Sequence, residues 1–147
     1  MEPLALHGLP QPDWNDSSSV DTALEALRRA HDKPSADEAY DRFLWAVGNN
    51  HAGTFYPVVL AALPQIEQIL ADGSAWSQHA AMESLIDLGG SFVPEEGHGA
   101  HLGASLQATL QAFIQSMRPY IQPLVQGDGA RAKSAIQLLE LIDDLSA

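Results

Sequence analysis

Three absences narrow the classes of function open to this 147-residue chain. It has no cysteine, which excludes disulfide bonds and thiolate metal sites and fits a reducing cytoplasm. Its longest purely apolar run, residues 58–63, is far shorter than the ~20 residues that span a bilayer. It also lacks a Gly-Lys-Ser/Thr phosphate loop and the G-x-S-x-G nucleophile motif. We therefore predict a cytoplasmic protein that is not an enzyme, with no catalytic residues and no cofactor.

Basic residues are scarce and unevenly distributed. The chain carries 19 acidic and 7 basic residues, for a net charge of −12. No Lys or Arg lies between Arg42 and Arg118, although that segment contains six acidic residues: Glu67, Asp72, Glu83, Asp87, Glu95 and Glu96. Nucleic acids and anionic membranes bind through Lys and Arg, so we expect neither as a partner. A cationic protein would be attracted, and a merely solubilising acidic surface is the alternative interpretation.

Apolar residues recur at helical spacing through most of the chain, and no segment alternates convincingly with a period of two. We predict a single domain over residues 1–147. Its predicted parts are an extended N-terminal arm at 1–16, helical pair 1 at 17–50, helical pair 2 at 54–89, an inserted loop at 90–103 and helical pair 3 at 104–147. Trp14 is expected to pin the arm by packing on the first helices.

Several helix boundaries follow from capping and breaking residues. Ser18-x-x-Asp21 and Ser35-x-x-Glu38 predict capping boxes for the first two helices. Gly48 is a suitable residue to end the second helix.

The later helices are predicted in the same way. Thr54 is expected to begin the third helix, which continues with a bend past Pro64. The fifth helix is expected to begin near Leu102, with that side chain facing inward, and the sixth to span residues 130–145.

The central helical hairpin is repeated along the chain. Pro64-x-Ile66-x-x-Ile69-Leu70 recurs about 55 residues later as Pro119-x-Ile121-x-x-Leu124-Val125, and Leu85-Ile86-Asp87 recurs as Leu141-Ile142-Asp143. A repeated hairpin is typical of stacked architectures, because each pair covers its apolar face with the next pair. We therefore predict an all-α fold of about six helices in three antiparallel pairs, arranged as a solenoid or a compact helical stack.

The glycine-rich stretch at residues 89–104 contains the best candidates for chemistry. Glu95, Glu96, His98 and His101 place carboxylates and imidazoles within seven residues, a composition that can ligate a divalent metal. The glycines between them argue against the helix that a Glu-x-x-His motif needs, and no second Glu-x-x-His is present. We predict no metal site and keep a metal-dependent enzyme as the least favoured alternative. A dispersed Ser/His/Asp triad is permitted by the composition but favoured by nothing in it.

A resemblance to a known family rests on two neighbouring motifs: Gly48-Asn49-x-His51-x-Gly53-Thr54-x-Tyr56-Pro57 and Ala62-x-Pro64-x-Ile66-x-x-Ile69-Leu70. This part of the chain resembles HEAT-like α-solenoid proteins of bacteria, which include immunity proteins of polymorphic toxin systems. The resemblance covers roughly residues 36–90 and, more faintly, 109–145. It implies a HEAT-like right-handed α-solenoid and a small cytosolic protein that binds a toxin domain and blocks its active site. The 89–104 insertion and the presence of only three pairs depart from a regular HEAT array.

The favoured hypothesis is a non-catalytic immunity protein that binds and inhibits a cationic toxin domain. Function is expected in the unrepeated parts of the chain, the 48–53 turn and the 89–104 loop. Predicted partner contacts are Glu83, Asp87, Glu95, Glu96, His98, Trp45, Asn49 and His51. A solvated surface charge is the alternative for each acid, and core packing is the alternative for Trp45. A HEAT-like scaffold or regulatory adaptor without a toxin partner is the alternative function.

Overall fold

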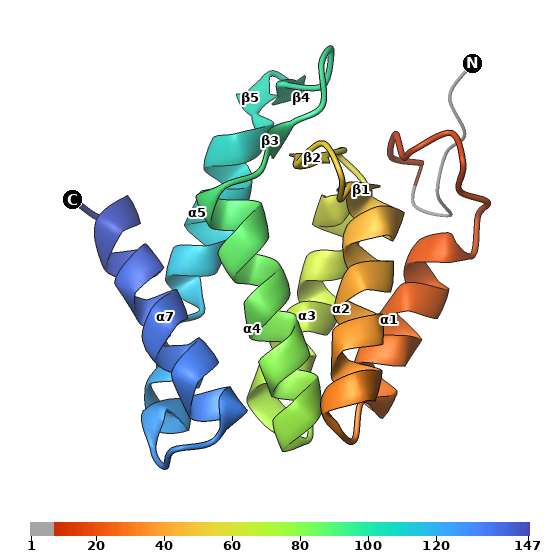
Figure 1. Cartoon of the computed structure of the whole chain (residues 1–147). Coiled ribbons are helices and arrows are strands. Elements are labelled where there is room, and N and C mark those ends of the chain that lie inside the picture. Colours follow the sequence, from red (N-terminus) through yellow and green to blue (C-terminus); the bar gives the residue numbers. More distant parts are fainter. Residues whose placement is uncertain (1–7) are drawn as a thin grey trace.

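The computed structural model describes residues 8–147, most of which are helical (Figure 1). The α-helices are α1 (Ser19–Arg29), α2 (Lys33–Val47), α3 (Val59–Asp72), α4 (Ala75–Gly90), α5 (Leu106–Ser116), α6 (Arg118–Ile121) and α7 (Ala130–Leu145), and a short 3-10 helix, η1 (Gln122–Val125), follows α6. The strands are β1 (Gly48–Asn49), β2 (Thr54–Phe55), β3 (Val93–Pro94), β4 (Ala100–His101) and β5 (Ala104–Ser105). The fold is mostly helical, as predicted, with only short strands.

The long helices run up and down, so their connections lie at two opposite ends (Figure 1). At one end, here called the turn end, residues 30–32, 73–74 and 126–129 make short connections. At the other end, the loop end, residues 48–58 join α2 to α3 and residues 91–105 join α4 to α5. The N-terminal segment 8–18 also lies at the loop end, where the backbone N–H of Val58 donates to the carbonyl of Pro10 at 2.9 Å.

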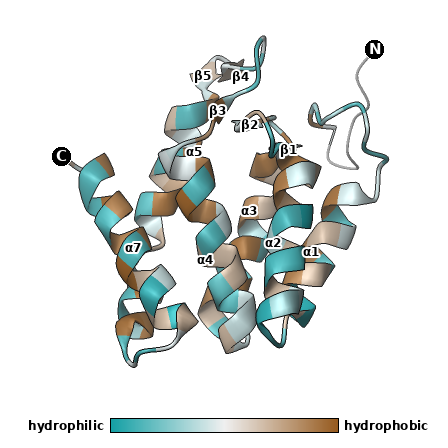
Figure 2. Ribbon diagram, viewed as in Figure 1, coloured by the Kyte–Doolittle hydropathy of each residue, from teal (hydrophilic) through white to brown (hydrophobic). Residues whose placement is uncertain are grey.

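Hydrophobic and hydrophilic residues are interspersed along the helices (Figure 2). Nearly all buried apolar side chains of the described helices belong to one continuous cluster, and Ala132 on α7 lies outside it. No helix within residues 8–147 is long and apolar enough to cross a membrane.

Helix α4 lies at the centre of this core. It packs against α1, α2, α3, α5 and α7, and its contact with α7 is the most extensive in the protein. Small buried residues on α4, among them Ser77, Ala80, Ser84 and Gly89, allow these close approaches. A Cβ atom on Gly89 would lie 2.5 Å from Cδ1 of Ile114 on α5. The main neighbour of α7 is therefore α4, and α7 contacts its predicted partner α5 much less.

The two predicted capping boxes are wrong. The Ser18 side chain makes no capping hydrogen bond, and Asp16 instead accepts from the backbone N–H of Ser18 at 2.8 Å. In α2 the box joins Asp32 and Ser35: the Ser35 N–H donates to Asp32 Oδ1 at 2.9 Å, and the Asp32 N–H donates to Ser35 Oγ at 3.2 Å. Helix α2 begins earlier than predicted because Pro34 is accommodated in its first turn, where a missing N–H leaves no helical bond unmade.

Thr54 and Leu102 do not begin helices. Thr54 lies in β2, and α3 starts only at Val59, although it does continue through Pro64 as predicted. Leu102 was expected to face inward but lies at the tip of the β4–β5 hairpin and is 93% exposed. Pairing of β4 with β5 delays the helix, which begins after Ser105.

Candidate functional site

A three-stranded sheet joins the two unrepeated parts of the chain at the loop end. Strand β2 pairs antiparallel with β1 and parallel with β3. The Val93 N–H donates to the Gly53 carbonyl at 3.0 Å, and the Glu95 N–H donates to the Phe55 carbonyl at 2.8 Å. The turn after α2 and the loop after α4, both predicted to carry function, are therefore held side by side.

Gly48 makes this pairing possible. A Cβ atom at this position would lie 1.9 Å from the carbonyl oxygen of Thr54 and 2.7 Å from the Cα of Phe55. Only glycine leaves room for the neighbouring backbone at this distance. Asn49 then shapes the turn, because its Oδ1 accepts from the Ala52 N–H at 2.9 Å. Of the two predicted contacts in this turn, Asn49 is half-buried and His51 is exposed.

The loop after β3 is held by contacts with the rest of the protein. The Thr54 hydroxyl donates to the Glu95 carboxylate, and the His98 N–H donates to the Glu95 carbonyl at 2.9 Å. The imidazole of His98 lies 5.1 Å from the ring of Tyr56, tilted by 44°. Glu96 is exposed. In the part of the chain that the structure describes, no three His, Asp or Glu side chains are grouped so that they could hold one metal ion.

Hydroxyl groups, and not Lys or Arg, hold most of the carboxylates in the segment that lacks basic residues. Tyr120 donates to Glu67 at 2.8 Å, Ser134 donates to Glu83 at 2.9 Å, Tyr40 donates to Asp87, and Thr54 donates to Glu95. Each of these bonds joins two elements that are far apart in the sequence. A hydroxyl donor satisfies a carboxylate oxygen without cancelling its charge. Glu83 and Asp87, predicted as partner contacts, thus cross-link the helices through donors that carry no positive charge.

The bond between Tyr40 and Asp87 ties α2 to α4. Burial, and then the hydrogen bond to Asp87, raise the pKa of Tyr40 far above its ordinary value of 10.0. Tyr40 therefore keeps its proton and remains the donor at neutral pH. The bond to Glu67 likewise raises the pKa of Tyr120.

One cluster has the residue types of a hydrolase triad in a different order. The hydroxyl of Ser134 donates to Glu83 and lies 2.8 Å from Nδ1 of His79. In a catalytic triad the imidazole lies between the serine and the acid, whereas here the serine lies between the other two. Ser134 is also only 2% exposed, so a substrate has no access to its hydroxyl. The cluster cross-links α4 and α7.

Side chains of the N-terminal segment complete the end of α2. The Trp14 Nε1–H donates to the Trp45 carbonyl at 2.9 Å, and the Asn15 amide donates to the Ala46 carbonyl at 2.6 Å. These carbonyls belong to the last turn of α2, where no helical donor is available. The prediction that Trp14 pins the arm is confirmed for the described part of the arm, and residues 1–7 of the predicted arm lie outside the described residues.

Trp45 remains partly accessible beside Trp14. The two rings meet edge to face, with centroids 5.7 Å apart. Trp45 is 37% exposed and Trp14 is 50% exposed. With Arg42 they line an open cavity of about 460 Å³. Trp45 packs against Trp14 and is also partly exposed. Neither core packing alone nor an exposed partner contact alone, the two interpretations made from the sequence, therefore describes it.

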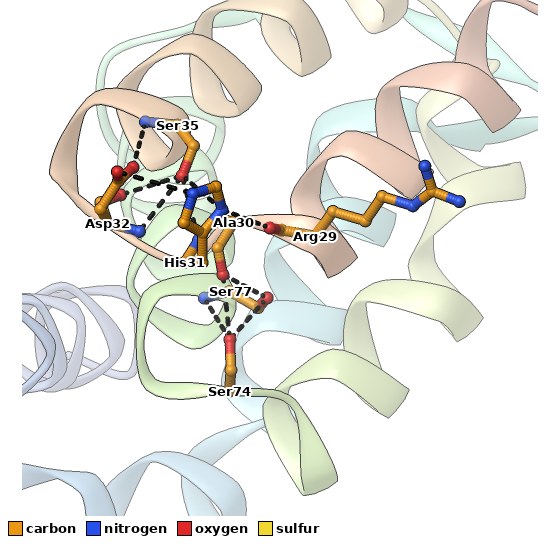
Figure 3. A network of polar contacts seen from close by, with 7 residues as sticks. All are labelled: Arg29, Ala30, His31, Asp32, Ser35, Ser74 and Ser77. Carbon is orange, nitrogen blue, oxygen red and sulfur yellow. Dashed lines mark hydrogen bonds and ion pairs between the residues drawn. The ribbon is translucent and has the colours of Figure 1, made fainter.

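At the turn end, side chains around residues 30–35 and 74–77 are bonded to one another and to the backbone (Figure 3). The Ser74 hydroxyl donates to the Ala30 carbonyl at 3.1 Å and accepts from the Ser77 N–H at 3.2 Å. The capping box of Asp32 and Ser35 lies next to them. Together these bonds satisfy groups that helix ends leave unpaired.

Two exposed apolar side chains at the loop end were not predicted as site residues. Val93 on β3 is 50% exposed, and Leu102 is 93% exposed. The sequence feature that could have placed Leu102 in a turn is Gly103, because glycine is common in the two-residue turns of β-hairpins. Strands of two residues are too short to produce a recognisable alternation.

No family model, curated protein or solved structure matches this chain. The function is therefore argued from the residues of the site itself.

Proposed function

We propose that this chain is a non-catalytic immunity protein that binds and inhibits a cationic bacterial toxin domain through its loop end. The observation that carries the proposal is the asymmetry of the helical stack. Both long connections between helices lie at one end, and the connections at the other end are short. Binding residues concentrate on loops that a rigid scaffold positions.

The charge distribution supports a cationic partner. Residues 43–117 contain no Lys or Arg, and the hydroxyl donors that hold carboxylates there carry no positive charge. At the loop end, Glu96 and His51 are exposed and Trp45 offers an aromatic edge. A negative surface of this kind attracts a basic domain from a distance and accelerates its association.

The proposal includes a HEAT-like right-handed solenoid architecture and a cytoplasmic location. Helix α4 contacts both α2 and α7, and helix α3 contacts both α1 and α6, so the helices form two rows. Two such rows are what stacked helical pairs produce, because each pair buries its apolar face against the next.

The test is co-expression of the chain with the toxin-domain protein encoded beside its gene. We expect the chain to restore growth and to co-purify with that protein. The dissociation constant should rise with salt concentration, mainly through slower association. A complex whose affinity is independent of salt would contradict the electrostatic mechanism. A complex that forms without restoring growth would favour the alternative, a scaffold or regulatory adaptor.

A further inference from the structure

The β4–β5 hairpin has a leucine at a position where the backbone disfavours one. Ala100 pairs with Ser105 and His101 with Ala104, so Leu102 and Gly103 form a two-residue turn. Their φ angles are 52° and 79°, as a type I′ turn requires. Asn-Gly is the favoured sequence for such a turn, since a Cβ-bearing residue in the left-handed region meets steric repulsion. Within residues 8–147, Leu102 is the one residue other than glycine with a positive φ.

The fold gains nothing from this leucine. Its side chain is 93% exposed, so it contributes no apolar burial to offset the strain. Helix α5 does not depend on it either, because Ser105 supplies the cap by accepting from the Ala108 N–H at 3.1 Å. A residue that is both strained and exposed, on a loop that carries other exposed side chains, points to a role outside the fold.

We infer that Leu102 is the apolar anchor of the partner-binding surface, inserting into an apolar pocket that basic side chains surround on the cationic protein partner. The inference rests on the proposed function and adds the residue and the type of pocket. Interfaces commonly place an apolar anchor at the centre and charged groups at the rim. Glu96 supplies such a charge on the same loop, and Val93 adds a second exposed apolar side chain at this end.

The negative charge of the protein favours a cationic protein as the partner of Leu102 over a second copy of the chain or an anionic bilayer. A second copy of the chain would bring a net charge of −12 against the same charge. An anionic bilayer would be repelled for the same reason, since no Lys or Arg lies in residues 43–117. A basic protein with an apolar pocket is complementary to both the leucine and the net negative charge of the chain.

The test compares Leu102→Asn with Leu102→Met in the full-length chain. Asparagine suits the turn but is not apolar, so we expect the melting temperature to rise by about 2–4 °C. The same substitution should weaken binding to the toxin-domain protein encoded beside the gene by about tenfold or more. Methionine keeps an apolar side chain and should bind within about threefold of the wild type. Ile136→Gln, which removes an exposed apolar side chain from α7, is the matched control and should leave affinity unchanged.

The outcomes separate this inference from the proposed function. If the wild type binds and Leu102→Asn binds equally well, the anchor is overturned and the proposed function stands. A wild type that binds no such protein overturns both. A variant Leu102→Asn that melts below the wild type overturns the inference, because Leu102 would then serve the fold. Self-association in sedimentation, or binding to anionic vesicles, that disappears in Leu102→Asn would assign the leucine to another occupant and overturn it too.

Discussion

The two ends of the helical stack satisfy their polar groups in different ways. At the turn end the bonds are made by side chains at helix ends: the capping box joins neighbours in sequence, and Ser74 donates to the Ala30 carbonyl, 44 residues away. At the loop end the bonds join distant segments, as when Asn15 donates to the Ala46 carbonyl and Thr54 to Glu95. Bonds between distant segments thus occur at both ends, and the loop end differs by adding a three-stranded sheet that pairs its two long connections.

The ends also differ in what they leave exposed. The large apolar side chains that are exposed among the described residues are Trp14, Trp45, Val93, Leu102 and Ile136. All of them except Ile136, on α7, lie at the loop end. The hydrogen bonds at the turn end thus hold helices together, whereas the loop end presents the exposed apolar side chains that mark an interaction surface.

The largest expected effect tests whether the loop end depends on its small sheet. Gly48→Ala places a methyl group against the Thr54 carbonyl and should destabilise the protein by about 3 kcal/mol or more, because backbone must move. Urea denaturation measures the change. Gly99→Ala is the matched control, since no atom lies within 4 Å of its Cβ position, and it should change stability by less than about 0.5 kcal/mol. Equal effects of the two substitutions would refute a special role for Gly48.

A smaller effect is expected at the turn end. Ser74→Ala removes the cap of α4 and the bond to the Ala30 carbonyl, and should lower stability by about 1 kcal/mol. Ser74→Thr keeps the hydroxyl and should retain most of it. Neither variant should alter partner affinity, measured by titration calorimetry. A loss of affinity in Ser74→Ala would show that the turn end also takes part in binding.

Tyr40 tests the hydroxyl–carboxylate links that hold the helices between the two ends. Tyr40→Phe should lower stability at neutral pH by about 1 kcal/mol. Because the folded pKa of Tyr40 is raised, its contribution is fully present below pH 10, the ordinary value, and is lost as the pH rises toward the folded pKa. Stability of the wild type should therefore fall more steeply above pH 10 than that of Tyr40→Phe. Parallel pH profiles from thermal denaturation would rule out this link as a source of alkaline instability.

The smallest effect concerns charge alone. Glu96→Gln at the loop end should leave the melting temperature unchanged, since Glu96 is exposed, and should slow association with the cationic partner by about twofold. Asp72→Asn removes one charge from the same base-free segment at the turn end and is its matched control. Stopped-flow kinetics at low salt should show the larger effect for Glu96→Gln. The reverse order would move the binding surface away from the loop end.

Strong helical periodicity made several helices predictable, whereas connections were not. The sixth predicted helix, residues 130–145, is observed as α7 with the same bounds. The start of α5 was misplaced because a hairpin of two-residue strands has no alternation to detect, and Leu102 was consequently assigned to the core. The capping box of α2 was misplaced because Asp32 precedes a proline that the first turn tolerates.

The chain's sequence by itself determined a mostly helical, acidic protein, because helical spacing and charge are properties of local composition. It also marked the two unrepeated stretches, whose role in binding stays a prediction. Only the tertiary structure decided which carboxylates are used inside the protein. Glu83 and Asp87 meet hydroxyl donors on other helices, whereas Glu96 meets solvent, and such pairings depend on how helices pack. It also decided that Leu102 is exposed in a strained turn, since that follows from strand pairing.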